Sequence, residues 1–352
     1  MARTKHEQLI VGDQEILPGE RYIIDLPVAP VYTHDNLAIS MQVIRGKRPG
    51  PTLFVSGAIH GDEINGVEII RRILKDPMME KLKGTLIAIP IVNVYGFINH
   101  TRYLPDGRDL NRSFPGSTRG SLTGRVADTF MSEIVEKCSH GIDLHTGARH
   151  RSNFPQIRAN LNDPQTLEMT NAFGVPIAIN ARTRDGSLRQ CAAELGVPVL
   201  LYEAGEALRF DEIYIRAGVK GVLSVMRHIG MLRKSRAKTV PPAISQSSSW
   251  LRAPESGILR VLVPLGEEVE AGQTIGFIAD PLGTSETDVV AHESGVVIGR
   301  TNLPLVYEGD ALFHIARVNS KDEWTVEEFH EELEPEDNDT NPNDLSSAPI
   351  AD

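Results

Sequence analysis

Hydrophobic residues in this chain occur in short runs that alternate with amphipathic stretches of helical length. Between residues 51 and 236 the runs read TLFVSGAI, TLIAIPIV, GIDL and VPVLLY, and the clearest helical spacing of apolar residues begins near Asp62. Alternating strands and helices are typical of an α/β domain. We therefore predict a mainly parallel central sheet with flanking helices, preceded by strands in residues 1–50, where LAISMQV has the pattern of a strand.

Three further segments follow the predicted α/β domain of residues 1–238. Residues 239–250 are rich in Pro and Ser and are predicted to be a linker. Residues 251–320 contain short β-branched runs separated by Gly, which is typical of a small all-β domain. Residues 321–352 are acidic and polar and are predicted to be largely disordered.

The net charge is −11 over 352 residues, and residues 321–352, with one basic and 12 acidic residues, account for all of it. The remainder has no basic excess to attract nucleic acid or an anionic membrane. No apolar run approaches the ~20 residues of a membrane span, and the N-terminal sequence has no apolar stretch of signal-peptide length. Two cysteines exclude a disulfide-rich scaffold. We expect a cytoplasmic protein without nucleic-acid or membrane partners; a homo-oligomer is compatible with the sequence.

Residues that can bind a metal follow three of the apolar runs. His60 and Glu63 come after TLFVSGAI, His145 after GIDL, and Glu203 after VPVLLY. Ligands of open α/β sheets bind at the carboxyl ends of the strands, so these side chains are expected to converge. His60 and Glu63 are three residues apart, a spacing that places both on one face of a helix.

The chemistry of these residues suits zinc, which accepts imidazole nitrogen and carboxylate oxygen; two His and one Glu leave an open catalytic position. His60, Glu63 and His145 would hold one Zn²⁺ per chain. Glu203 would then be free to act as general base toward the metal-bound water and as acid toward the leaving amine. Each residue alone has an ordinary interpretation, since an HxxE spacing arises by chance about once in such a chain. Their joint placement favours the metal site.

An Asn-Arg pair lies in a predicted loop flanked by Gly107 and Pro115. In the sequence DLNRSFPG, Asn111 and Arg112 are adjacent. A guanidinium group binds a carboxylate in a bidentate manner, and an amide adds a directed hydrogen bond. The pair is therefore a candidate for binding a substrate carboxylate, although an arginine paired with a structural acid remains the alternative.

Four motifs, HGDE, DLNRSFPG, DLHTG and YEAGE, resemble in sequence and order those of the succinylglutamate desuccinylase/aspartoacylase family, over residues 37–235. That family consists of zinc amidohydrolases with the zinc-carboxypeptidase fold. The resemblance implies that His60, Glu63 and His145 are the zinc ligands and that Glu203 is the catalytic glutamate.

The resemblance also implies roles for residues around the Asn-Arg pair. Asn111 and Arg112 match the pair that binds the substrate carboxylate. Arg102, in TRY, resembles the arginine that stabilises the developing oxyanion. Because the spacer between Arg102 and the pair is longer than in related proteins, Arg108 is an alternative. Arg189, in DGSLRQ, lies where the family draws a further substrate contact, but its spacing to the YEAGE motif does not match.

Asp143 precedes the metal-binding histidine of DLHTG by two residues. Such a carboxylate can orient a metal ligand. It can equally be a polar residue at the end of a strand, and the sequence leaves both interpretations open.

The predicted all-β domain, with GEEVEAGQTIG and HESGVVIGR, resembles a biotinyl or lipoyl carrier domain. A carrier needs a lysine for its prosthetic group, and residues 261–320 contain none. Family resemblance instead implies that this domain covers the mouth of the active site or shapes the pocket for the acyl group.

These features together predict a zinc-dependent hydrolase that cleaves the amide of a small N-acyl amino acid or related amine. Two alternatives remain open at this stage. A metallocarboxypeptidase would use the same residues on peptide C-termini, and a non-catalytic binding protein would use the fold for recognition alone. The complete set of expected catalytic residues disfavours the second alternative.

Overall fold

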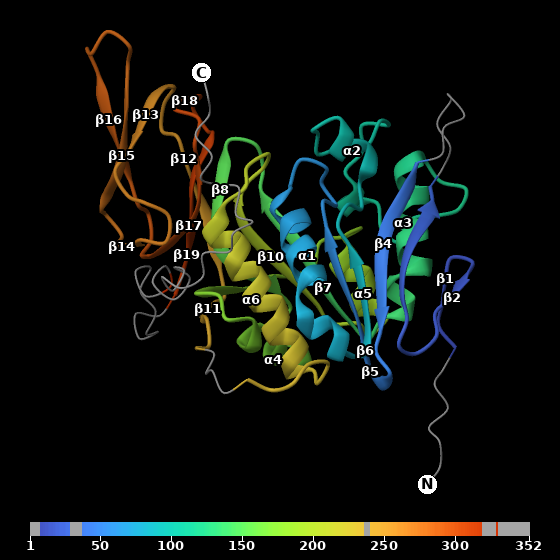
Figure 1. The fold of residues 1–352 in the computed structure, drawn as a ribbon. Helices are drawn as coiled ribbons and strands as arrows, with labels where there is room; N and C mark the ends of the chain where they lie inside the picture. The colour runs from blue at the N-terminus through green and yellow to red at the C-terminus, as the bar shows by residue number, and fades with distance from the viewer. Residues whose placement is uncertain (1–7, 29–36, 236–239, 319–328, 330–352) are drawn as a thin grey trace, which may run out of the picture.

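Four parallel strands form the centre of the computed structural model, which describes residues 8–28, 37–235, 240–318 and Phe329. In the order in which they pair (Figure 1), they are β6 (Lys83–Ile89), β5 (Arg48–Gly57), β7 (His140–Gly147) and β10 (Val199–Glu206). The predicted apolar runs account for all four. Strand β7 is buried along its whole length, as expected for a parallel strand covered on both faces.

Antiparallel pairings extend the sheet on both sides of this centre. On one side β4 (Ala38–Arg45) pairs with β6 and β3 (Arg21–Pro27) pairs with β4. On the other side β8 (Arg151–Ala159) runs antiparallel to β10, and β9 (Ile177–Asn180) runs parallel to β8. A two-stranded ladder of β1 (Ile10–Val11) and β2 (Gln14–Glu15) precedes β3. The sheet is therefore mixed rather than mainly parallel, and the prediction holds for its centre only.

Helices cover both faces of the central sheet. Helices α1 (Asn65–Lys75), α4 (Pro164–Phe173) and α6 (Glu212–His228) pack on one face, whereas α3 (Leu122–Glu133) and α5 (Leu188–Glu194) belong to the core of the other. The remaining helical segments are α2 (Val94–Ile98) and the 3₁₀ turns η1 (Pro77–Lys81), η2 (Leu110–Arg112) and η3 (Val135–Lys137). None of the described helices is long and apolar enough to cross a membrane.

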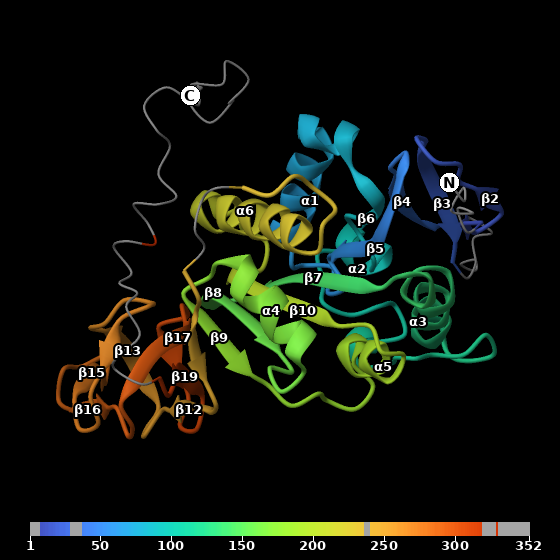
Figure 2. The ribbon, with the colours of Figure 1, turned by 90° about the horizontal axis from the view of Figure 1, so that it is seen from below.

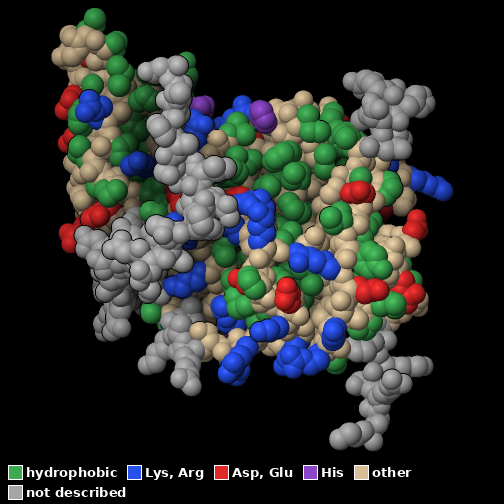
Figure 3. All heavy atoms as spheres, in the orientation of Figure 1, with side chains coloured by type: hydrophobic (Ala, Val, Ile, Leu, Met, Phe, Trp, Pro, Cys, Tyr) green, Lys and Arg blue, Asp and Glu red, His purple; other side chains and the backbone are tan. Residues whose placement is uncertain are grey.

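The outer surface of helices α1 and α6 carries both basic and acidic side chains (Figure 3). Arg72 of α1 forms ion pairs with Glu68 of the same helix and with Glu212 at the start of α6. The more exposed of the two, the pair with Glu212, contributes little to stability, about 0–1 kcal/mol. The helices are held instead by their buried faces, which include Ile69, Ile70 and Ile73 of α1.

The C-terminal strands form what we call the β-module, residues 248–316. Its strands are β12 (Ser248–Arg252), β13 (Gly257–Val261), β14 (Glu268–Val269), β15 (Thr274–Ala279), β16 (Glu286–Val290), β17 (Gly295–Thr301), β18 (Leu305–Val306) and β19 (Ala311–Ala316). It has a hydrophobic cluster of its own and a four-stranded sheet, β16-β15-β13-β18. Strand β17 also pairs with β8, so the central sheet continues into the β-module (Figures 1 and 2).

The segment predicted as a linker differs from that expectation. Within residues 239–250 the structure has β11 (Ala243–Ser245), which pairs with β9, and the start of β12. Ala243 and Ser245 are buried while Ile244 between them is half-buried, so the short segment adds a strand to the sheet despite its Pro and Ser content. The acidic tail lies outside the described residues, except Phe329, which is buried and has its ring 5.9 Å from that of Phe154.

Candidate active site

The three predicted metal ligands lie together at the carboxyl ends of β5 and β7. His60 and Glu63 belong to the turn between β5 and α1, and His145 lies near the end of β7. The Nδ1 atoms of His60 and His145 lie 2.7 Å from the two oxygens of the Glu63 carboxylate. All three side chains are buried, and their ligand atoms lie within 4.8 Å of one another. This donor set is one that zinc binds.

The local backbone differs in one respect from the sequence prediction. His60 and Glu63 share a tight turn, closed by a hydrogen bond from the Glu63 amide to the His60 carbonyl, and helix α1 begins only at Asn65. Gly61, between the two ligands, packs so closely on the α2 backbone that a Cβ would lie 2.0 Å from the carbonyl carbon of Gly96. The turn thus needs glycine at this position, since no side chain fits there.

Two aspartates orient the histidine rings. The Nε2 atom of His145 lies 2.7 Å from Asp143 Oδ2, and Ser56 Oγ donates a hydrogen bond to the other oxygen of Asp143. The Nε2 atom of His60 lies 3.1 Å from Asp109 Oδ1. Carboxylates behind metal-binding histidines fix the tautomer and the ring orientation. Asp143 thus lies behind the His145 ring, in the position that a ligand-orienting carboxylate would take. Sequence reasoning missed Asp109, although this residue begins the DLNR motif.

Electrostatics at this cluster favours a bound cation. Burial alone would raise the pKa of Glu63, but His60 and His145 hold that pKa far below its usual value. Burial opposes protonation of His145, yet Asp143 and Glu63 raise the pKa of its ring well above the ordinary value. Asp143 and Glu63 thus place negative charge around the His145 ring, and a metal ion bound there would take the place of the proton that this charge otherwise holds. The residues present fit a divalent zinc ion in donor type, number and surrounding charge.

The contact between Asp143 and His145 leads to a testable prediction. Asp143→Asn is expected to weaken zinc binding by about 10- to 100-fold, because the amide leaves the His145 ring less basic and less firmly oriented. Zinc affinity is measured by competition with a chromogenic chelator. Asp25→Asn provides the control, since Asp25 also accepts a hydrogen bond from a serine, Ser40, but lies on β3 far along the sheet. Unchanged affinity in Asp143→Asn would contradict the role assigned to Asp143.

The structure distinguishes between the two candidate arginines. Arg102 donates to Glu63 Oε1 at 3.1 Å and to Asp109 Oδ2 at 2.9 Å. Its side chain lines a cavity that also borders on His60, Glu63 and His145. The Arg108 side chain is 62% exposed, pairs at 4.0 Å with Asp106 and does not line that cavity. Of the two candidates, Arg102 is therefore the arginine that lies at this cavity.

The Asn-Arg pair lies in the 3₁₀ turn η2 and faces the same cavity. The side-chain oxygen of Asn111 accepts a hydrogen bond from the Leu188 amide at 3.0 Å, at the start of α5. This contact leaves the Asn111 amide group as the donor for a ligand. Arg112 donates to the Asn111 carbonyl and forms no ion pair with any described residue. Its charge is thus available to an anionic substrate.

Glu203 lies where β10 loses its regular pairing. The register shifts just after Glu203 on both sides of the strand, against β7 and against β8. Its carboxylate accepts a hydrogen bond from Asn153 Nδ2 at 2.5 Å, and its other oxygen lies 3.9 Å from Arg158 Nε. The carboxylate is not among the metal-ligand group but lines the same cavity.

The cavity in front of these residues has a volume of about 420 Å³. Its charged lining is mostly basic, with three acidic residues against seven arginines: Arg102, Arg112, Arg151, Arg158, Arg182, Arg184 and Arg189. Arg189 is held by two backbone carbonyls at 3.3 Å, and burial together with Arg158 lowers the pKa of Arg189 to about 10. Sequence reasoning had named three of these arginines and missed the others.

The β-module supplies one wall of this cavity through Ser248, Trp250 and His314. The rings of Trp250 and His314 are stacked with centroids 4.7 Å apart, and the Arg151 guanidinium lies 5.2 Å from the Trp250 ring. Burial, with Arg158 and Arg184 nearby, lowers the pKa of His314 to about 3, so that its ring is neutral at physiological pH. Of these three residues, His314 belongs to the predicted all-β domain, whereas Ser248 and Trp250 lie in the segment predicted as a linker.

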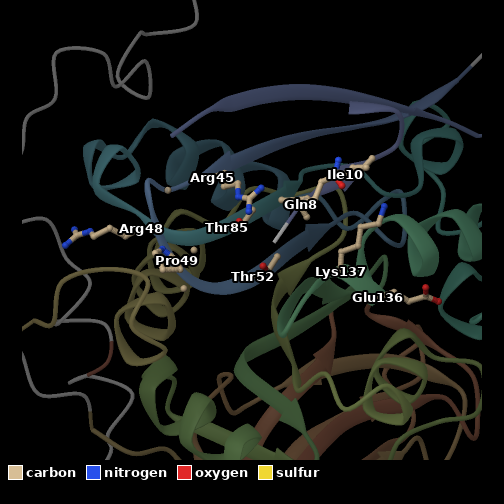
Figure 4. Close-up of a pocket in the computed structure, with 13 residues that line it drawn as sticks. Gln8, Ile10, Arg45, Arg48, Pro49, Thr52, Thr85, Glu136 and Lys137 are labelled. Atoms are coloured by element: carbon tan, nitrogen blue, oxygen red, sulfur yellow. The ribbon is translucent and has the colours of Figure 1, made fainter. Parts of the chain in front are cut away.

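A larger cavity of about 690 Å³ lies at the opposite end of the central strands (Figure 4). Thr52 and Thr85, near the starts of β5 and β6, line it together with Arg45, Arg48 and Lys137. No described residue of the metal-ligand group reaches it. The chemistry predicted from the sequence is therefore confined to the carboxyl ends of the strands, as in other open α/β sheets.

Comparison with known families agrees with this geometry. Residues 49–229 match the family model of the succinylglutamate desuccinylase/aspartoacylase catalytic domain. The chain belongs to the succinylglutamate desuccinylase/aspartoacylase family. The matched region contains all the predicted metal, catalytic and substrate-binding residues. The family assignment made from the four motifs is thus confirmed.

Individual known proteins are similar to this chain in sequence or in fold. The N-alpha-acetyl-L-2,4-diaminobutyric acid deacetylase of Halomonas elongata is 29% identical over 283 residues, which are 76% of this chain and 83% of the relative. The crystal structure of a succinylglutamate desuccinylase/aspartoacylase from Rhodobacter sphaeroides has a TM-score of 0.76 and 25% identity, covering 85% of this chain and 95% of that one. The ectoine utilization protein EutE (DoeB) from Ruegeria pomeroyi shares the fold, with a TM-score of 0.76 and 22% identity over 85% and 97% of the two chains. The chain is therefore a member of a deacylase family.

Proposed function

We propose that this protein is a zinc-dependent deacylase that hydrolyses the amide bond of a small N-acyl amino acid. One observation carries the proposal. The His60–Glu63–His145 cluster and the carboxylate of Glu203 face one cavity of about 420 Å³, which also contains Arg102 and the Asn111–Arg112 pair. Metal ligands, a free carboxylate and substrate-binding groups in one small cavity are what metal-assisted amide hydrolysis requires.

Each group of residues in the cavity has a distinct role in the proposed reaction. When bound by His60, Glu63 and His145, zinc would supply a Lewis acid and make a water molecule more acidic. Glu203 accepts a proton from the attacking water and returns it to the departing amine nitrogen. Arg102 donates hydrogen bonds to the carbonyl oxygen as it gains negative charge.

The Asn111–Arg112 pair fixes the substrate's orientation. A carboxylate held by the Arg112 guanidinium and the Asn111 amide sets which bond lies beside Glu203. The excess of arginines in the cavity supports an anionic substrate over one with a cationic side chain. The cavity volume is near the lower end of the about 300–1,000 Å³ of small-molecule sites, and the β-module forms one wall. These features support a small acyl amino acid rather than the C-terminus of a long peptide.

The test combines metal analysis with a substrate screen. We expect elemental mass spectrometry to find about one zinc per chain. Chelation should abolish activity, and adding zinc should restore it. The screen compares N-acetyl and N-succinyl derivatives of glutamate and aspartate with N-acetyl-diaminobutyrate and with C-terminal peptides, by the amine released. Release from the peptides alone would favour a carboxypeptidase. Absence of both bound zinc and hydrolysis would contradict the proposal.

Removing the Arg112 guanidinium is expected to weaken substrate binding. A hydrogen bond to a charged group is worth about 1.5–3 kcal/mol, so Arg112→Ala should raise KM by about 10- to 100-fold. Zinc content should stay unchanged, because Arg112 contacts none of the metal-binding side chains directly. Steady-state kinetics on the best N-acyl substrate measures the effect. The matched control is Arg108→Ala, which removes an exposed arginine of the same loop; an equal rise in KM in both variants would contradict a specific role for Arg112.

A further inference from the structure

We infer that Asn153 of β8 positions the Glu203 carboxylate and that Gly299, on strand β17 of the β-module, leaves the room that Asn153 needs to do so. The inference rests on the proposed function, in which Glu203 is the general base. It makes the β-module part of the machinery that aligns the catalytic group, beyond its contribution to the cavity wall.

The first step is the contact between Asn153 and Glu203. Asn153 is buried, and its Nδ2 donates to Glu203 Oε2 at 2.5 Å. Among the described residues this is the one side-chain hydrogen bond that Glu203 receives; Arg158 stays 3.9 Å from the other oxygen. A hydrogen bond to a carboxylate is stronger than one between neutral groups and fixes the direction of the acceptor. Asn153 thus determines which way the Glu203 carboxylate faces.

The backbone alone does not fix this orientation. Glu203 lies at the register shift of β10, where pairing with β8 passes from Gln156 opposite Glu203 to Asn153 opposite Gly205. A glutamate side chain has three rotatable bonds, and Glu203 is half-buried rather than packed in the core. A partner that holds the carboxylate oxygen is therefore needed for a reproducible geometry.

The second step is the contact between Asn153 and the β-module. Gly299 of β17 lies directly opposite Asn153 in the antiparallel pairing of β17 with β8. A Cβ at position 299 would lie 2.9 Å from Asn153 Oδ1 and 3.3 Å from the His314 Cβ. Glycine within a strand often marks a place where another group approaches closely. Here the absence of a side chain leaves room for the Asn153 amide in the orientation that donates to Glu203.

These two contacts predict the effect of adding a single methyl group at position 299. In Gly299→Ala the added Cβ meets the end of the Asn153 side chain, which can rotate away more easily than the backbone can move. Rotation of the amide removes its hydrogen bond to Glu203. A substitution in the β-module should therefore act on the chemical step without touching the metal ligands or the substrate-binding pair.

The experiment is a double-mutant cycle on the full-length zinc-loaded protein, with Asn153→Ala, Gly299→Ala and the double variant. Each single variant is expected to lower kcat by about 10- to 100-fold, the cost of a misplaced catalytic group. KM should change by less than about twofold, with zinc content unaltered. The double variant should be no slower than Asn153→Ala, since Gly299 acts through Asn153. Asn153→Ser, which keeps a donor, should recover part of kcat. Thr301→Ala, elsewhere on β17, is the control.

A crystal structure of Gly299→Ala supplies a readout independent of activity and should show the contact between Asn153 Nδ2 and Glu203 Oε2 broken. Wild-type kcat in Asn153→Ala and Gly299→Ala, with Glu203→Gln inactive, would overturn this inference and leave the proposed function intact. Full activity of Glu203→Gln would overturn the proposed function instead. Additive losses in the double variant, or an intact contact in the Gly299→Ala crystal, would overturn the part assigned to β17.

Discussion

Glu203→Gln is expected to lower kcat by about 10²- to 10⁴-fold, the usual contribution of a general acid–base. The amide is nearly the same size as the carboxylate but cannot accept the proton of the attacking water. Zinc content should equal that of the wild type, because Glu203 is not one of the three clustered ligands. Steady-state kinetics with metal analysis on the same preparation measures both quantities.

The matched control for Glu203→Gln is Glu206→Gln. Glu206 belongs to the same strand, but its carboxylate accepts hydrogen bonds from the His150 amide and from Asn302, and it does not line the active-site cavity. We expect near wild-type kcat in this variant. If Glu203→Gln retained full activity with zinc bound, another group would have to act as the base, and the proposed mechanism would be wrong.

His145→Ala is expected to abolish zinc binding and activity together. It removes one of three ligands and leaves Asp143 and Glu63 buried without the imidazole that lies between them. The loss of affinity should exceed the about 100-fold upper range for a residue that only orients a ligand. Zinc per chain after dialysis and the recovery of activity at increasing zinc concentrations provide the measurement.

His140→Ala tests whether such a loss is specific. His140 lies at the other end of β7, where it contacts Ser139 and Gln165. This variant should keep its zinc and its activity. Thermal unfolding of both variants separates metal loss from misfolding, and a His145→Ala protein that folds and still binds one zinc tightly would contradict the assignment of His145.

Prediction from sequence worked where hydrophobic pattern and chain position determine structure. Strands β6, β7 and β10 and the second half of β5 are largely buried, so they read as apolar runs in the sequence. Because they are parallel, the residues after β5, β7 and β10 meet at one edge of the sheet. This geometry brought His60, Glu63, His145 and Glu203 within reach of sequence analysis.

Strand β8 was not predicted from the sequence, because its residues are polar rather than apolar. Its sequence RSNFPQIRA contains charged and amide side chains and a proline, which is typical of a loop. These polar residues include Asn153 and Arg158, which face the active-site cavity. Their role depends on which strands neighbour β8, and that pairing joins residues about 50 and 150 positions apart along the chain. Local pattern carries no signal for such contacts.

The short strand within the predicted linker was not foreseen, for a similar reason. Ala243–Ser245 is too short to have a recognisable strand period, and its strand forms by pairing with β9 along the edge that β8 does not occupy. Asp109 was missed because its partner, the Nε2 of His60, lies 49 positions earlier in the chain. Tertiary contacts, rather than local propensity, decide both cases.

The continuation of the central sheet into the β-module has a consequence for how the chain can be shortened. Backbone pairing of Arg151–Asn153 with Gly299–Thr301 covers that edge of β8. A protein ending before residue 248 would expose these N–H and C=O groups to water and to other chains, and an uncovered strand edge is a template for aggregation. The β-module therefore also protects the edge of β8 from pairing with other chains. A shortened soluble enzyme has to retain the β-module or cover β8 with another segment.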